Sequence, residues 1–425
     1  MTSICMYFQV HQPHRLSKYT FFDIGTDKSY FGEERNKEIF ERVARKCYYP
    51  TNALIKKLIE QYNGRVRVSY SITGTFVEQC LKYDPGVLKS FQELVKTGCV
   101  DILDETYYHS LAYLVGQDEF KEQVKKHRDM IKEHFDYEPT IFRNTEAMYS
   151  NDIAKLVESL GYKGILAEGW HSYLGWRSPN YVYRPQGCDK IKLLMRNYRL
   201  SDDVSFRFST QGWPEYPLTA DKYARWLAGN EGQVINLFMD YETFGEHQWH
   251  ETGIFQFLEH LPSEVFKHPH LDFVTTKEAV ARYEPVGNID VPYVSSWADV
   301  DRDLTAWLGN EMQRNAFESV KRLEGEVKSL SDDVFLDMWR KLQTSDHFYY
   351  MCTKWFADGD IHKYFNDYVT PYDAYMNYMN ILSDFKQRHS EARTRKTKGV
   401  GEKPENGKPK RRRMRIVKKG NGHKA

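Results

Sequence analysis

The sequence predicts an α/β fold, in which a closed parallel barrel is followed by a helical domain and a disordered basic tail. Two observations predict the barrel. Short, almost entirely apolar runs recur along the N-terminal two-thirds of the chain, and segments with helical periodicity separate them. Strands that are apolar on both faces belong to a parallel sheet that is buried on both sides. A third observation predicts the helical domain, because beyond about residue 295 the apolar residues recur with helical spacing.

Seven or eight apolar runs are expected to form the strands of the barrel. In chain order they are 4–10, 66–72, 100–103, 140–143, 164–167, 191–196, 234–239 and 271–275. Capping residues mark some of the intervening helices. Asp84 and Pro85 predict the start of one helix, and Ser150 or Asn151 predicts the start of another that ends at Gly161.

The chain therefore divides into a barrel over 1–295, a helical domain over 296–385 and a disordered tail over 386–425. The tail holds sixteen Lys and Arg against three Asp and Glu, so the other residues hold 44 basic against 56 acidic side chains. An acidic body argues against an enzyme that acts on nucleic acid. The basic tail has two readings: a solvated, unstructured terminus, or a segment that contacts nucleic acid or another polyanion.

Composition limits the class of protein further. No run approaches the roughly 18 to 20 apolar residues that a membrane helix needs, and no basic segment precedes an apolar run at the N-terminus. We therefore expect a cytoplasmic protein with no membrane contact. The six cysteines are scattered without a C-x-x-C pair, which predicts reduced thiols rather than disulfides or a zinc site. Nothing in the sequence calls for a cofactor or a metal.

Polar side chains gather just after the predicted strands. In a parallel barrel these positions meet at the carboxyl ends of the strands, where active sites form. The residues concerned are His11, Gln12, Glu78, Asp104, Glu105, His109, Glu146, Glu168, Trp170, Asp240, Glu242, Glu246 and His247.

Two of these carboxylates suit acid/base chemistry on a sugar. Glu146 emerges a few residues past a buried strand, and Asp240 directly follows three apolar residues. Burial raises the pKa of a carboxyl group toward the range that a general acid requires near neutral pH. Two carboxylates about 5 to 5.5 Å apart can cleave a glycosidic bond with retention of configuration. The aromatic residues, 15% of the chain, can stack on sugar rings.

Four sequence blocks resemble the signature regions of glycoside hydrolase family 57. They are His11-Gln-Pro13, Asn144-Thr-Glu146-Ala-Met-Tyr149, Met239-Asp240-Tyr-Glu-Thr-Phe-Gly-Glu-His247 and Ser296-Trp-Ala-Asp-Val-Asp-Arg-Asp-Leu-Thr-Ala-Trp-Leu-Gly309. Their order and spacing match as well. The resemblance runs from residue 4 to about residue 385, and it is greatest to the α-amylases of the family.

The resemblance implies an incomplete (β/α)7 TIM-like barrel followed by a helical bundle that contributes to the cleft. It implies a retaining hydrolase of α-1,4-glucans such as maltooligosaccharides, with Glu146 as the nucleophile that forms the glycosyl-enzyme and Asp240 as the general acid/base. Together with position in the chain, it makes eight residues candidates for substrate binding: His11, Gln12, Glu78, His109, Trp170, His247, Trp297 and Asp299.

Three other functions stay open. A 4-α-glucanotransferase would use the same residues, because only the acceptor of the glycosyl-enzyme differs between hydrolysis and transfer. A metal-dependent hydrolase would gather a divalent ion with His11, Asp104, His109 and His247, although no tight ligand spacing is present. A glucan-binding protein without turnover would keep the aromatic cleft, but both candidate carboxylates are present here. The oligomeric state is not predicted.

Overall fold

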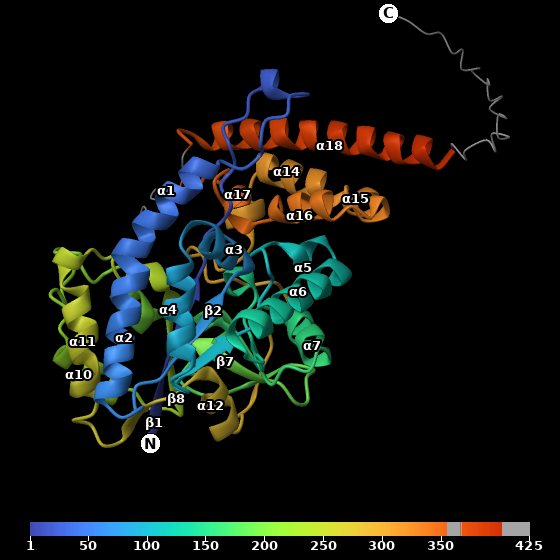
Figure 1. The fold of residues 1–425 in the computed structure, drawn as a ribbon. Coiled ribbons are helices and arrows are strands. Elements are labelled where there is room, and N and C mark those ends of the chain that lie inside the picture. Colours follow the sequence, from blue (N-terminus) through green and yellow to red (C-terminus); the bar gives the residue numbers. More distant parts are fainter. Residues whose placement is uncertain (355–365, 367, 402–425) are drawn as a thin grey trace, which may run out of the picture.

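Parallel strands form the centre of the fold in a computed structural model that describes residues 1–354, 366 and 368–401 (Figure 1). One sheet has the order β3-β2-β1-β8, with β9 also paired to β1, and a second has the order β4-β5-β7. A short pair joins β10 and β6. The bounds are β1 Thr2–Val10, β2 Val68–Ile72, β3 Val100–Leu103, β4 Ile141–Phe142, β5 Gly164–Glu168, β6 Arg184–Pro185, β7 Lys192–Arg196, β8 Val234–Asp240, β9 Leu271–Phe273 and β10 Asn288–Ile289.

Backbone hydrogen bonds connect the two larger sheets at both of their edges. The Arg143 amide donates to the Asp104 carbonyl at 2.9 Å, which joins β4 to the end of β3. At the other edge the Asn197 amide donates to the Asn236 carbonyl at 2.9 Å, which joins β7 to β8. Because the paired strands are parallel, their carboxyl ends share one end of the molecule. The eight predicted runs correspond to β1–β5 and β7–β9, so their prediction is confirmed.

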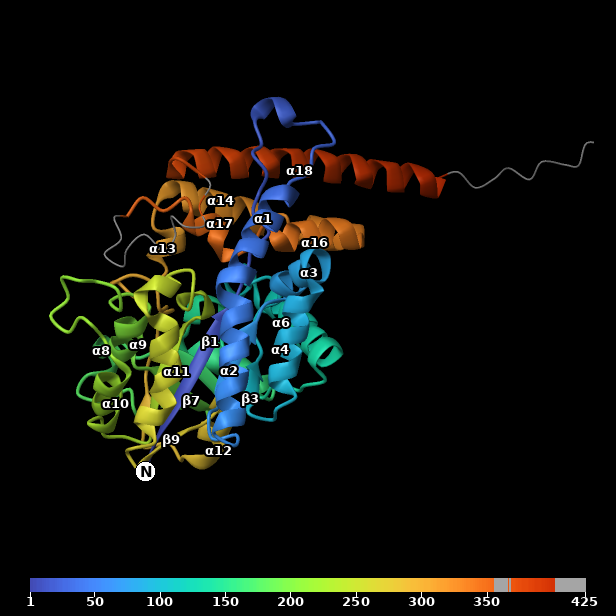
Figure 2. The same cartoon turned by 60° about the vertical axis from the view of Figure 1, so that its left-hand side comes forward.

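Helices cover the outside of these strands. Figures 1 and 2 show α2, α4, α6, α7, α10 and α11 packed around them. The helix bounds in this part are α1 Glu33–Val43, α2 Tyr49–Gln61, α3 Gly74–Tyr83, α4 Pro85–Val95, α5 Ala112–Val115, α6 Gln117–Phe135, α7 Asn151–Ser159, α8 His171–Leu174, α9 Tyr198–Ser205, α10 Ala220–Ala228, α11 Ile254–Val265 and α12 Thr276–Arg282.

The predicted helix starts are confirmed by their caps. The Asp84 side chain accepts a hydrogen bond from the Gly86 amide at the start of α4. The Ser150 hydroxyl accepts from the Ile153 amide at the start of α7. Such caps satisfy amides that have no partner inside the helix, and each is worth about 1 kcal/mol.

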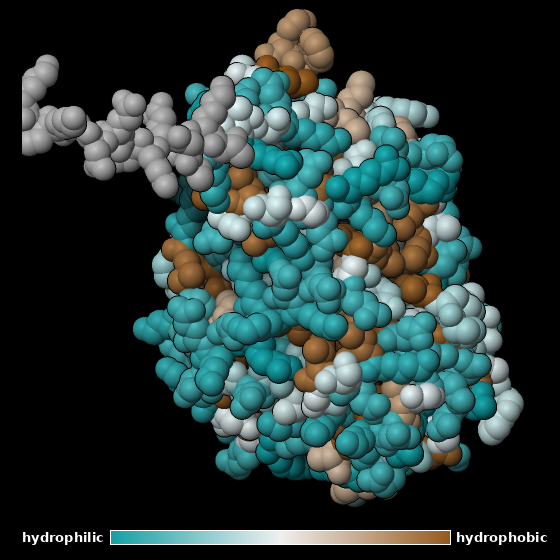
Figure 3. All heavy atoms as spheres, turned by 90° about the vertical axis from the view of Figure 1, so that its right-hand side faces the viewer, coloured by the Kyte–Doolittle hydropathy of each residue, from teal (hydrophilic) through white to brown (hydrophobic). Residues whose placement is uncertain are grey.

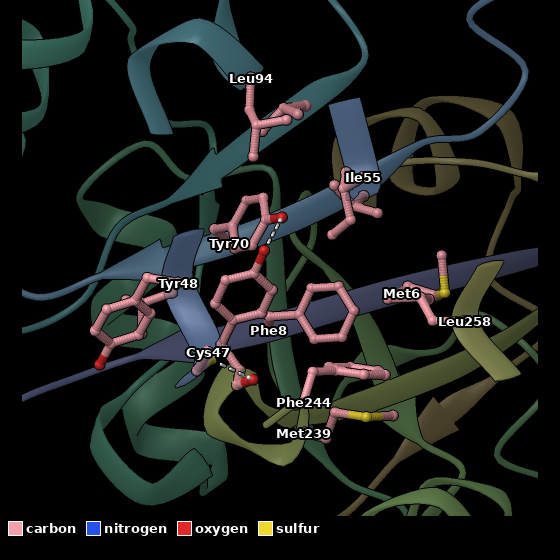
Figure 4. Packing of buried hydrophobic residues seen from close by; sticks show 14 of the residues in the cluster. Met6, Phe8, Cys47, Tyr48, Ile55, Tyr70, Leu94, Met239, Phe244 and Leu258 are labelled. Atoms are coloured by element: carbon pink, nitrogen blue, oxygen red, sulfur yellow. Dashed lines mark hydrogen bonds between the residues drawn. The ribbon is translucent and has the colours of Figure 1, made fainter. Parts of the chain in front are cut away.

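An aromatic core holds β1 against its neighbours. Phe8 on β1 packs against Tyr70 on β2 and against Phe244, with ring centroids 5.7 Å apart in both pairs (Figure 4). It also packs against Tyr241 just past β8, at 5.3 Å between centroids. Phe8 is 1% exposed. Burying such a ring contributes about 1.5–3 kcal/mol. This packing fixes the register of β1 beside β8, and therefore the positions of the residues that follow both strands.

A helical layer lies across the carboxyl ends of the strands (Figures 1 and 2). Trp307 of α13 and Trp339 of α16 are fully buried in this layer. The Ser345 amide donates to the His109 carbonyl at 3.0 Å, which ties this layer to the loop after β3. Its bounds are α13 Thr305–Leu308, α14 Glu311–Lys321, α15 Glu324–Leu330, α16 Asp333–Lys341, α17 Ser345–Tyr349 and α18 Pro371–Gly401.

The expected disorder of the tail is wrong for residues 386–401. Helix α18 continues to Gly401, past the predicted boundary at residue 385. Phe385 and His389 both pack on Phe335 of α16, and no glycine or proline interrupts the chain between 372 and 398. These contacts and the helix-forming residues that follow extend the helix. Residues 402–425 of the predicted tail lie outside the described residues.

Three further observations bear on the class of protein. All six cysteines are buried and none forms a disulfide, as predicted. Among the described residues, no helix combines the length and the apolar character needed to cross a membrane. On the face shown in Figure 3, hydrophilic residues predominate and hydrophobic ones form small separate patches. That face therefore offers no broad apolar area.

Candidate active site

A cavity of about 160 Å³ lies at the carboxyl ends of the strands, beneath the helical layer. Its walls come from the ends of β1 and β8, the loops after β3 and β4, the segment around Trp297 and helix α17. Residues that are far apart in the sequence therefore meet here. The lining includes His11, His109, Glu146, Asp240, Trp297 and Asp346.

Glu146 is held in place from two sides. It lies in the short helix η3 (Thr145–Ala147) after β4, with a left-handed φ of 55°. The Trp297 indole Nε1 donates to its Oε2 at 2.9 Å, and the Ser345 hydroxyl donates to its Oε1 at 3.0 Å. A left-handed backbone is costly for a residue other than glycine and persists where the surroundings hold it. The carboxylate is therefore fixed in one orientation.

Positive charge stabilises the ionised form of Glu146. His109 Nε2 lies 3.5 Å from its Oε1, and the fully buried Arg143 lies behind, over the Trp297 ring. Burial by itself raises the pKa of the carboxyl group. The hydrogen bond and charge of His109 and the charge of Arg143 outweigh that effect and lower the pKa to about 2. Glu146 is therefore a carboxylate throughout the neutral and mildly acidic range.

The pKa of Asp240 is shifted in the opposite direction. Asp240 ends β8 beside Gln9 of β1, and it faces the same cavity as Glu146. Burial raises its pKa, and the negative charge of Glu146 raises it further, to about 6. Its neighbour Glu242 is also buried and accepts a hydrogen bond from the Tyr48 hydroxyl at 2.5 Å. Burial and the charge of Asp240 raise the pKa of Glu242 to about 8.

Among the acidic residues of the cavity, Glu146 is thus an ionised carboxylate, whereas Asp240 keeps its proton up to mildly acidic pH. Different surroundings push apart the pKa values of Glu146 and Asp240, which is the arrangement that separates a nucleophile from a general acid. Such a pair can attack a saturated carbon on one side and protonate a leaving oxygen on the other.

Two histidines stack at the wall of the cavity. The rings of His11 and His109 have centroids 4.2 Å apart. His11 Nε2 lies 3.0 Å from Asp346 Oδ2, and its Nδ1 lies 3.0 Å from the Thr73 hydroxyl. Burial and the charge of His109 lower the pKa of His11, although Asp346 opposes this. The two rings thus differ in charge at neutral pH, because His109 has a raised pKa of about 9 despite its burial.

The structure brings most of the predicted site residues together. Both candidate catalytic residues and six of the eight candidates for substrate binding line this cavity. The predicted residues that line it are His11, Gln12, His109, Glu146, Asp240, His247, Trp297 and Asp299.

Glu78 and Trp170 do not line the cavity. Glu78 lies on α3, more than one helical turn past the end of β2, and pairs with His14 and Lys341, each at 2.8 Å. Those partners lower its pKa to about 2 against the effect of burial. Trp170 instead caps α8 and packs edge-on against Tyr173. Position after a strand identified them, but the local helices carry both away from the cavity.

Asp104 does not join His11 or His109. It is fully buried and bonds to His127 at 2.5 Å, to Arg128 at 3.2 Å and to the Tyr162 hydroxyl. The set of ligands considered for a metal ion is therefore not assembled around Asp104. Within the described residues no group of three or more His, Cys, Asp or Glu is placed to hold a metal ion.

Several residues that line the cavity or contact its lining were not predicted. Ser345 and Asp346 come from α17, which carries no motif, and they contact Glu146 and His11. Arg302 lies within a quoted sequence block, where its guanidinium donates to the Trp297 carbonyl at 2.5 Å. Because Arg302 is a charged residue inside that block, the sequence did contain a signal that could have identified it. Nothing in the local sequence distinguished Ser345 or Asp346.

Comparison with known proteins shows the family of this chain. The model of glycosyl hydrolase family 57 matches residues 5–292. The chain belongs to this family. A Methanocaldococcus jannaschii protein named "Putative alpha-amylase" is 51% identical over 390 residues, which cover 89% of this chain and 83% of the relative. The chain is therefore a family 57 glycoside hydrolase of the amylase-like kind, as the sequence blocks predict.

Solved structures of family 57 enzymes have a similar fold. The branching enzyme of Pyrococcus horikoshii aligns with a TM-score of 0.64 and 16% identity, over 90% of this chain and 88% of that one. The 4-α-glucanotransferase of Thermococcus litoralis aligns with a TM-score of 0.55 and 16% identity, over 82% of this chain but only 50% of that one. At this identity the likeness concerns the α/β fold, with its parallel sheets and many helices.

Proposed function

We propose that this chain is a retaining hydrolase of α-1,4-glucans, of the α-amylase type. Glu146 attacks the anomeric carbon and forms a glycosyl-enzyme, while Asp240 protonates the leaving glycosidic oxygen. Asp240 then removes a proton from water, which attacks the anomeric carbon and releases Glu146. Two successive inversions retain the configuration of the substrate.

One observation carries the proposal. The two acids line one cavity, and their surroundings shift their pKa values in opposite directions, to about 2 for Glu146 and about 6 for Asp240. A nucleophile must be ionised and a general acid protonated at the same pH, and this pair satisfies both conditions below about pH 6. The amylase name of the M. jannaschii relative supports the choice of α-glucan as substrate.

The other cavity residues have proposed roles in holding the sugar. His11, Gln12, His109, His247, Trp297 and Asp299 line the space beside the two acids. In this proposal the strands and their helices form an incomplete (β/α)7 barrel over 1–295. The helical domain over 296–385 closes the cleft from above, and its Trp297 and Ser345 both donate to Glu146.

The experiment incubates the purified chain with maltooligosaccharides of defined length and follows product lengths by mass spectrometry. Hydrolysis gives only products shorter than the substrate. Glu146→Gln and Asp240→Asn should each lower turnover by about three orders of magnitude or more, because each removes a group required in the transition state. Unchanged chains with the wild-type protein would instead identify a glucan-binding protein without turnover, and would refute the proposal.

The same time course separates hydrolysis from transfer. A 4-α-glucanotransferase would pass the glycosyl unit from Glu146 to a sugar hydroxyl and would build a ladder of products longer than the substrate. Such a ladder as the main early product would replace the hydrolase proposal by this alternative.

A further inference from the structure

Glu105 is a buried carboxylate to which the proposed chemistry gives no part. It follows β3 directly and is fully buried. Its Oε2 lies 2.9 Å from His109 Nδ1, and its Oε1 accepts a hydrogen bond from Gln9 Nε2 at 2.8 Å. Gln9 accepts in turn from the Tyr7 hydroxyl at 2.7 Å. Because a buried charge costs several kcal/mol unless it is paired, its location beside His109 calls for an explanation.

His109 lies between two carboxylates. Its Nδ1 faces Glu105 at 2.9 Å, and its Nε2 faces Glu146 at 3.5 Å. A neutral imidazole carries one N–H and can donate to only one of them, whereas an imidazolium donates to both. With an acceptor at each nitrogen, the ring is both charged and fixed in orientation.

We propose that Glu105 is a positioning residue that acts on the nucleophile through His109. By holding the imidazolium at Nδ1, it directs the Nε2–H toward Glu146 Oε1 and keeps that carboxylate ionised and correctly aimed. The inference rests on the proposed function, since it takes Glu146 as the nucleophile. Glu105 itself contacts His109 and Gln9 and does not line the cavity.

The charged groups around His109 make its protonation depend on Glu105. Besides Glu105 and Glu146, it is approached by His11 just past β1 and by Asp346 from α17. Arg143, just past β4, acts on both carboxylates, Glu105 and Glu146. His11 has a lowered pKa, so the stacked ring is neutral near neutral pH, and Asp346 is engaged by His11. Removing Glu105 therefore leaves Glu146 as the main anion facing the ring.

The pairing of His109 with Glu105 and Glu146 sets the size of the pKa change that removal of the Glu105 charge should cause. Burial alone would lower the pKa of His109, but the bonds and charges of Glu105 and Glu146 raise it to about 9. An opposite charge within about 4–6 Å shifts a pKa by about 1–3 units. Glu105→Gln keeps the shape and an acceptor for Nδ1–H but removes the charge. It should therefore lower the proton affinity of His109 by about tenfold to a thousandfold.

The test is an NMR titration of the whole chain labelled at histidine, with the His109 signal assigned by its loss in His109→Gln. We expect His109 to titrate above pH 8 in the wild type and at least one unit lower in Glu105→Gln. The matched control is Asp101→Asn. Asp101 is another buried carboxylate on β3, bonded to Tyr137 and Thr276 away from the cavity. That control should leave the titration of His109 unchanged.

Kinetics with maltooligosaccharides give a second readout. Glu105→Gln should lower kcat by about 10- to 100-fold with little change in KM, because the loss concerns the attacking group and not substrate binding. Glu105→Asp keeps the charge and should restore part of kcat and of the His109 shift. Asp101→Asn should lower stability but not kcat.

Several outcomes would overturn the inference. It is wrong if Glu105→Gln leaves the titration of His109 or kcat at the wild-type value. If Glu105→Gln does not fold, the wild-type titration decides, since a His109 signal that titrates near pH 6.5 or below contradicts the arrangement. If the wild type shows the high titration but no glucan turnover, the proposed function fails and the pairing of Glu105 with His109 stands.

Discussion

Azide should give opposite anomers with two alanine variants, Glu146→Ala and Asp240→Ala. The substrate is an α-glycosyl fluoride, whose leaving group needs no protonation. In Glu146→Ala, azide displaces fluoride directly, and one inversion yields the β-glycosyl azide. In Asp240→Ala, Glu146 displaces fluoride first and azide then displaces Glu146, so two inversions yield the α-glycosyl azide.

The structure sets the azide concentration that the first variant needs. Truncation of Glu146 leaves the Trp297 Nε1–H and the Ser345 hydroxyl, which donated at 2.9 and 3.0 Å, facing the vacated space. Hydrogen bonds to a charged group contribute about 1.5–3 kcal/mol each. Two of them suffice for a dissociation constant near 1 mM, which corresponds to about 4 kcal/mol. Rescue should therefore reach half of its maximum at millimolar azide.

The assay identifies the anomer of the azide product by proton NMR, with azide-free reactions as controls. An α-azide from Glu146→Ala, or the same anomer from both variants, would refute the assignment of the two roles. Triple replacement of Glu146 by Ala, Trp297 by Phe and Ser345 by Ala removes both donors. It should raise the half-saturating azide concentration well above that of Glu146→Ala.

Three further predictions concern pH, metal ions and the end of the chain. Because the raised pKa of Asp240 keeps its proton up to about pH 6 and Glu146 is ionised above about pH 2, kcat/KM should fall as pH rises through about 6. A value of kcat/KM that still rises at pH 8 would contradict this. EDTA should leave glucan turnover unchanged, and a loss that a divalent cation restores would revive the metal-dependent alternative. Removal of 402–425 should abolish salt-sensitive binding to heparin without changing turnover, whereas reduced turnover would show that this segment serves the active site.

The parts of the fold that sequence predicted well are those set by local chemistry. Strands buried on both faces must be apolar throughout, so β1, β2 and β8 were visible as runs without any knowledge of their partners. Caps such as Asp84 and Ser150 act within one helical turn, so they could also be predicted from the sequence. The end of α18 was not predicted, because contacts of Phe385 and His389 with Phe335 extend a helix that composition alone did not indicate.

Prediction of the site failed where the position of a residue after a strand did not determine the direction of its side chain. Glu78 and Trp170 follow strands as His109 and Glu146 do, but each lies on or caps a helix that turns its side chain toward other partners. Sequence spacing reports how far a residue lies from a strand end and not which way it points. Ion pairs with His14 and Lys341 hold Glu78 away from the cavity, and those partners became evident only in three dimensions.

The proposed nucleophile, Glu146, depends on residues beyond the segment that the family model matches. That segment ends at residue 292, and the two side chains that donate to the Glu146 carboxylate are Trp297 and Ser345. His11 likewise owes its ring orientation to Asp346. A chain cut at residue 295 would keep His109 and Glu146 but lose both donors. The segments that carry the strands supply the two proposed acids, and the helical layer supplies both donors to Glu146, so the candidate active site depends on both parts of the chain.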